Sequence, residues 1–133
     1  AKLTELVKEH KPSLLITTEL RGVSGHLDHV AVAMIASYVY RENRWIDAIW
    51  YNCISKKSSS FMKNYFVFFP EGFDREDVDL VVDITSVFQK KIAAARCHKT
   101  QIKDALRVIA KWLILPKEEW FFIEKRRSTV LLV

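Results

Sequence analysis

Two histidines and a carboxylate lie close together in this chain, at His26, Asp28 and His29. Neutral imidazole is a common metal ligand, and imidazolium can give a proton to a leaving group. Because side chains three positions apart are neighbours on a helix, His26 and His29 are expected to share a face. The residue types therefore predict metal-assisted or acid–base chemistry. The alternative is structural: His29 packs at a helix start, and Asp28 is a favourable first-turn carboxylate.

A strand, a glycine-containing loop and a helix are expected to position this trio. Residues 14–19 are apolar nearly throughout, which is typical of a buried parallel strand. Gly22 and Gly25 interrupt that pattern, and residues 27–42 have the apolar spacing of a helix. In open α/β sheets, ligands bind outside the carboxyl ends of the strands. The trio thus falls where such a fold places its site.

The rest of the chain alternates between helical and extended patterns. Helices are expected at residues 3–10, 87–97 and 101–114, strands at 48–54, 65–69 and 80–84, and a polar loop at 56–60. This alternation predicts an α/β fold with a mostly parallel sheet. At 133 residues, a single domain over residues 1–133 is the natural count.

The run from Gly22 to His29, Gly-Val-Ser-Gly-His-Leu-Asp-His, resembles a motif of the PIG-L/LmbE family that is usually written G-x-x-G-H-P-D-H. Residues 11–17 are similar to the family's strand before that motif. Residues 91–101 are similar to its later helix, K-x-x-A-x-x-x-H-x-S-Q. The matches follow the family's order along the chain. Family members are mostly zinc-dependent deacetylases that act on N-acetylglucosamine conjugates.

The resemblance implies a partial Rossmann-like, three-layer α/β/α fold and a role for each residue of the motif. It implies that His29 binds zinc and that His26 faces the substrate, where it donates a proton or stabilises an oxyanion. Asp28 would then orient His26. His26 and Asp28 are therefore the candidate catalytic residues, and His29 is the candidate metal ligand.

Three further residues are candidates for binding the substrate, which the resemblance implies is an N-acetylated amino-sugar conjugate. Arg21 and Ser24 lie in the loop before the motif, and His98 belongs to the later helix. Two alternatives stay open. For Arg21 the stronger interpretation is an ordinary surface arginine. His98 is equally explained as a helix C-terminal cap.

The chain departs from the family in the first motif. Its histidines are His10, His26, His29 and His98, and none is followed by Pro-Asp-Asp as in the family's H-P-D-D. The resemblance implies that this motif supplies two of three zinc ligands and the general base. The remaining ligands are therefore expected from a missing N-terminal segment, since Asp28, Asp83 and His98 could supply them only if the chain folds back.

Two functions follow from these observations. The first is the C-terminal portion of a zinc-dependent hydrolase that removes an acetyl group from an N-acetylglucosamine-type substrate and is incomplete in this chain. Its partner would be an N-terminal half or a second copy of the chain. The alternative is a non-catalytic binding or assembly module that kept the deacetylase-like fold.

Composition restricts the partners and the location. The net charge is +5, but residues 1–87 hold 10 Lys/Arg against 12 Asp/Glu, and residues 88–133 hold 11 against 4. The basic C-terminal third is interpreted as a solvated helix face in preference to a nucleic-acid surface. The longest apolar run, residues 30–40, is too short to cross a bilayer. The two cysteines form no disulfide framework, so a reducing, cytoplasmic location is expected.

Overall fold

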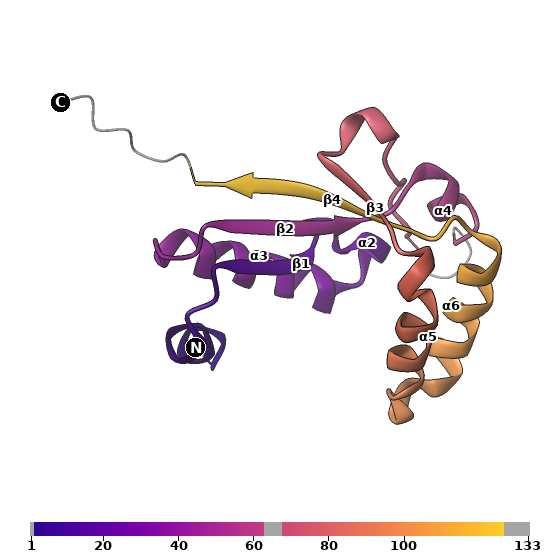
Figure 1. The fold of residues 1–133 in the computed structure, drawn as a ribbon, viewed down its shortest axis with the longest axis horizontal. Helices are drawn as coiled ribbons and strands as arrows, with labels where there is room; N and C mark the ends of the chain where they lie inside the picture. The colour runs from indigo at the N-terminus through magenta and orange to yellow at the C-terminus, as the bar shows by residue number, and fades with distance from the viewer. Residues whose placement is uncertain (1, 63–67, 127–133) are drawn as a thin grey trace.

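A computed structural model describes residues 2–62 and 68–126 of the chain (Figure 1). Its strands are β1 (Leu14–Thr18), β2 (Ala48–Cys53), β3 (Leu80–Asp83) and β4 (Glu118–Lys125). Its α-helices are α1 (Lys2–His10), α2 (Gly22–Gly25), α3 (Leu27–Glu42), α4 (Lys56–Ser60), α5 (Phe88–Arg96) and α6 (Ile102–Ile114). Short 3-10 turns cover Arg75–Asp77, Thr85–Val87 and Lys99–Gln101. No helix in the described part is long and apolar enough to span a membrane.

The described strands form one mixed sheet in the order β1-β2-β4-β3. β1 and β2 are parallel, as expected for strands joined through a helix. β4 is antiparallel to both β2 and β3. The α/β class is confirmed, but the expectation of a mostly parallel sheet is wrong for the described residues, because β4 was not anticipated and inserts between β2 and β3.

The core lies between β1, β2 and the helices α1 and α3. Val39, Ile46 and Ile49 are at most 1% exposed, and Leu15 and Tyr51 pack against them from the sheet. The Ser37 hydroxyl on α3 is 2.9 Å from the Tyr51 hydroxyl on β2, so the polar end of the tyrosine is also satisfied. This packing holds helix α3, including its first turn, against the two parallel strands.

The opposite face of the sheet carries an apolar row that runs across three strands. Ile16 on β1 is in register with Trp50 on β2, and Trp50 is in register with Ile123 on β4. Ile16 is 60% exposed. Among the described elements, α1 and α3 cover the other face, and α5 and α6 stand together at one end of the sheet (Figure 1). A three-layer arrangement is therefore not found in the described part of the chain.

Several boundaries follow the sequence pattern, and two do not. The helices expected at 87–97 and 101–114 are α5 and α6, and the short strand at 80–84 is β3. Residues 56–60 form helix α4 instead of a loop, because the Ser55 hydroxyl accepts a hydrogen bond from the Ser58 amide at 3.1 Å and caps it. Most of the strand expected at 65–69 lies outside the described residues, and Phe68 and Phe69 are not in a strand.

Arg126, directly after β4, closes the C-terminal end of α3. Its guanidinium donates to the carbonyls of Tyr40, Ile46 and Asn43, the last two at 2.9 and 3.3 Å. It also lies 4.6 Å from the centre of the Tyr40 ring. Helix C-terminal carbonyls have no partner within the helix and carry partial negative charge, so a cation stabilises them.

We expect Arg126→Ala to lower the free energy of unfolding by about 2 kcal/mol, since it removes several hydrogen bonds from a charged donor to carbonyl groups. Urea unfolding followed by circular dichroism measures the change. Lys125→Ala is the control, because Lys125 is exposed at the end of β4 and its replacement should change stability by less than about 0.5 kcal/mol. Equal stability of the two variants would contradict the role given to Arg126.

Candidate functional site

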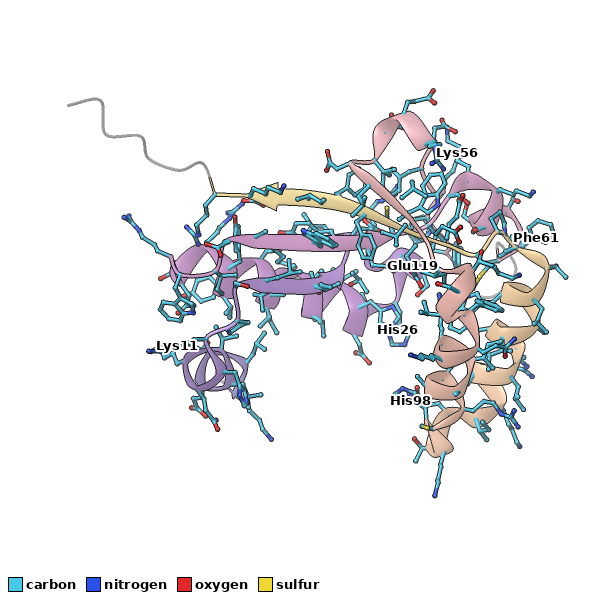
Figure 2. The ribbon with its side chains drawn as sticks, in the orientation of Figure 1. Lys11, His26, Lys56, Phe61, His98 and Glu119 are labelled. Atoms are coloured by element: carbon cyan, nitrogen blue, oxygen red, sulfur yellow. The ribbon has the colours of Figure 1, made fainter. Side chains whose placement is uncertain are left out.

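A cavity of about 1110 Å³ opens between the β1–α3 connection, the end of β2 and the α5–α6 pair. The structure brings most of the predicted site residues to its wall. Those that line it are Ser24, His26, Asp28, His29 and His98. In Figure 2, His26 at the start of α3 and His98 after α5 lie on opposite sides of this space. The cavity thus joins two motifs that are far apart in the sequence.

His29 is held with one ring nitrogen against the backbone. Its Nδ1 lies 3.1 Å from the Gly22 carbonyl oxygen and 3.4 Å from the Ser24 hydroxyl. A carbonyl oxygen can only accept a hydrogen bond, so Nδ1 is the nitrogen that carries the proton. The lone pair of the neutral ring is therefore on Nε2. This is the tautomer that a histidine has when it binds a metal through Nε2.

His26 has the opposite tautomer. It is the N-cap of α3, and its Nδ1 accepts a hydrogen bond from the Asp28 amide at 3.2 Å. In the neutral ring the proton is therefore on Nε2. The Asp28 carboxylate is 3.8 Å from the same Nδ1. The centres of the His26 and His29 rings are 5.3 Å apart, so the two rings are neighbours on the cavity wall.

The two predicted binding residues of the loop have different surroundings. Ser24 is 8% exposed, and its hydroxyl lies 3.5 Å from the Gly22 carbonyl oxygen that also accepts from His29. Arg21 is not among the residues that line the cavity. Its guanidinium stacks 4.1 Å from the centre of the Phe73 ring and contacts the Glu19 carboxylate at 3.4 Å.

The described residues do not complete a metal site. No group of three or more His, Cys, Asp or Glu side chains in residues 2–62 and 68–126 is arranged to hold a metal ion. Hydrogen bonds from Thr85, first from its side chain and then from its backbone amide at 2.7 Å, lower the pKa of the Asp83 carboxyl. Asp83 does not line the cavity. The Nδ1-protonated form of His29 would fit a metal as one ligand, and a complete site would need further ligands from outside the described residues.

Sequence reasoning missed the polar network on the far wall of the cavity. The Glu119 carboxylate on β4 pairs with the Lys91 ammonium on α5 and accepts from the Asn52 amide on β2 at 3.1 Å. Lys91 also lies 4.1 Å from the centre of the Trp112 ring. Nothing in the sequence pattern pointed to Glu119, because the strand that carries it was not predicted. Lys91 is the first residue of the later motif and could have been found.

Both lysine and arginine side chains that line the cavity are held in ion pairs. Lys91 pairs with Glu119, and Arg107 lies 3.4 Å from Asp104. The basic character of the C-terminal third is thus largely offset where it meets the cavity.

The two cysteines should differ in reactivity. Cys53, at the end of β2, is 2% exposed, and burial, followed by the nearby Glu19 carboxylate, raises the pKa of its thiol to about 12. The thiolate is the reactive form, so Cys53 stays neutral and inert well above pH 8. We expect a thiol reagent to modify one group in the folded chain at pH 8, the exposed Cys97, and two after unfolding in urea. Rapid labelling of a Cys97→Ser variant would contradict this.

The fold and the site define an α/β protein in which two imidazoles of opposite tautomer lie at the carboxyl end of two parallel strands. Two curated proteins similar to the chain carry the name 1D-myo-inositol 2-acetamido-2-deoxy-alpha-D-glucopyranoside deacetylase. The protein from Mycobacteroides abscessus is 23% identical over 75% of this chain and 40% of its own length. That from Saccharomonospora viridis is 25% identical over 76% and 42%. No family model and no solved structure matches the chain.

The chain therefore spans about two fifths of the length of the curated relatives it matches. Those relatives are, by name, deacetylases of an N-acetylated amino sugar linked to inositol. The similarity is distant, at 23% and 25% identity.

Proposed function

We propose that this chain is the C-terminal portion of a zinc-dependent deacetylase that acts on N-acetylated amino sugars. The observation that carries the proposal is the opposite tautomer of two neighbouring imidazoles. His29 has its lone pair on Nε2, as a metal ligand requires, and His26 has its proton on Nε2, as a donor requires.

Each residue of the pair has one task in this proposal. His29 binds the metal. When bound, zinc polarises the acetamide carbonyl and lowers the pKa of its water. His26 donates a hydrogen bond from Nε2 to the acetamide oxygen as negative charge develops there. To give that proton to the departing amine nitrogen, the ring would first have to take up a second proton at Nδ1 and so become imidazolium. Asp28 orients the His26 ring, because its amide donates to Nδ1 and its carboxylate lies 3.8 Å from the same nitrogen.

The cavity wall supports a sugar-like substrate. Lys91, Glu119 and Asn52 present a hydrogen-bonded set of donors and acceptors, and Trp112 adds an apolar surface. His98 lies across the cavity from His26 and would contact the part of the substrate remote from the acetyl group (Figure 2). In this proposal Arg21 does not bind the substrate, and it only supports the loop.

An additional segment would complete the site at the open edge of β1. In the described sheet β1 pairs with β2 on one side, and its other edge has no strand among the described residues. A further parallel strand there would end beside the His26 and His29 loop, where strand carboxyl ends bring ligands together. Helices attached to that strand would cover the apolar row of exposed Ile16 and half-buried Trp50 and Ile123.

The test is to supply that segment. The chain is produced alone, and also together with the N-terminal part of the Mycobacteroides abscessus deacetylase. Bound zinc is measured by mass spectrometry, and free amine is measured after incubation with the N-acetylglucosaminyl-inositol substrate. We expect the complex to hold about one zinc ion and to release amine, because a catalytic site needs about three protein ligands. The chain alone should show no tight zinc site by calorimetry.

Two results would count against the proposal. A complex that binds zinc and the sugar without releasing amine would favour the non-catalytic binding module. A stoichiometric, slowly exchanging zinc ion in the chain alone would show that the site is complete without any added segment.

A further inference from the structure

The loop that presents both histidines has a strained backbone. Gly22 and Gly25 have φ of 73° and 72°, values that glycine adopts easily. Val23 between them has φ 59° and ψ −53°, which a β-branched residue rarely adopts. Such a conformation persists only where the surroundings determine it. Contacts with the rest of the protein must therefore hold this loop in place.

Glu19 is the group that holds it. Its side chain is 8% exposed, and its two carboxylate oxygens accept hydrogen bonds from the backbone amides of Arg21 at 2.7 Å and Val23 at 2.9 Å. The backbone of Glu19 adds two more contacts: its carbonyl accepts from the Gly22 amide at 2.7 Å, and its amide donates to the Asn52 carbonyl at 2.9 Å. Bonds from amides to a carboxylate are strong, because the acceptor is charged.

The conformation of this loop determines which ring nitrogen of His29 carries the proton. The Gly22 carbonyl oxygen, which follows from the loop conformation, accepts the Nδ1 proton of His29 at 3.1 Å. Gly22 also packs closely on the start of α3, where an added Cβ would lie 3.0 Å from the Val30 amide nitrogen. A shift of the loop would move this carbonyl away from His29. An imidazole without such a partner prefers its proton on Nε2, which is the nitrogen needed for the metal.

We infer that Glu19 is a positioning residue: it holds the 21–23 loop so that the Gly22 carbonyl fixes the Nδ1-protonated tautomer of His29. Glu19 touches neither the cavity nor the expected substrate, and it acts through the loop. The consequence for metal binding rests on the proposed function, but the control of the tautomer does not. Arg21, stacked on Phe73, supplies the counter-charge that allows a carboxylate to be buried here.

The test reads the tautomer directly in the 133-residue chain without metal. Two-bond nitrogen–proton correlation spectra of uniformly ¹⁵N-labelled protein, recorded at a pH where imidazole is neutral, distinguish the protonated from the unprotonated ring nitrogen. The variants are Glu19→Ala and the isosteric Glu19→Gln, with Glu9→Ala on the exposed face of α1 as the control. The signals of His26 and His98 in the same spectra report whether the rest of the site is unchanged.

We expect the wild-type chain and Glu9→Ala to show His29 protonated at Nδ1. In Glu19→Ala the His29 pattern should change to an average in which the Nε2-protonated form dominates, with the His98 signals unmoved. Glu19→Gln keeps one acceptor oxygen, folds with the wild-type side-chain shape, and should give an intermediate pattern. An unchanged His29 pattern in a folded Glu19 variant would overturn the inference. If the tautomer depends on Glu19 but the completed protein binds no zinc, the proposed function fails and this inference stands.

Discussion

Gly72→Ala is expected to destabilise the protein by about 3 kcal/mol and to lower its Tm by roughly 10 °C. A Cβ at this position would meet the backbone carbonyl carbon and oxygen of Ser55 and would lie 2.6 Å from the Ile54 oxygen. These atoms cannot rotate away as a flexible side chain does. The two backbone segments would have to separate to admit one methyl group.

Separation would break several hydrogen bonds at once. The Gly72 amide donates to the buried Ser59 hydroxyl at 2.9 Å, the Phe73 amide to the Ile54 carbonyl at 2.9 Å, and the Lys56 amide to the Phe73 carbonyl at 2.9 Å. Thermal unfolding by circular dichroism measures the loss, with Glu71→Ala at the exposed neighbouring position as the control. A Gly72→Ala variant as stable as that control would show that the segment yields easily.

The features of the site that were predicted well from the sequence depend on residues that are neighbours along the chain. The apolar run of β1, the glycines after it and the helical spacing of α3 are all properties of neighbouring residues, so they place His26 and His29 correctly at a strand-to-helix junction. The tautomers could not be predicted. They depend on where the Gly22 carbonyl and the Asp28 amide point. The first belongs to the strained loop that contains Val23, and the second to the first turn of α3.

The elements that the sequence missed depend on distant partners. The centre of β4 is a continuous apolar run, and only its antiparallel pairing with β2 and β3, far away in the chain, makes it a central strand. Glu119 was therefore missed as part of the cavity wall. Helix α4 has a polar sequence, and its formation depends on the Ser55 cap and on Ser59, which is 1% exposed beneath Gly72.

His26 and His29 are expected to fail in different ways when they are replaced in the completed protein. His29→Ala removes the Nε2 lone pair that binds the metal, so zinc and deacetylation should be lost together. His26→Gln keeps a hydrogen-bonding side chain of similar size but cannot act as an acid. It should keep the full zinc content and lose about 100-fold or more in kcat.

The measurement pairs zinc content with the rate of amine release for each variant, and His10→Ala serves as the matched control. His10 is at the end of α1, outside the residues that line the cavity, so its replacement should change neither quantity. A further distinction is the KM, which His26→Gln should leave nearly unchanged, because the donated proton matters when charge develops and not when the sugar binds. Equal loss of zinc in the His26 and His29 variants would instead make both imidazoles metal ligands, and the donor role derived from the Asp28 amide contact would be wrong.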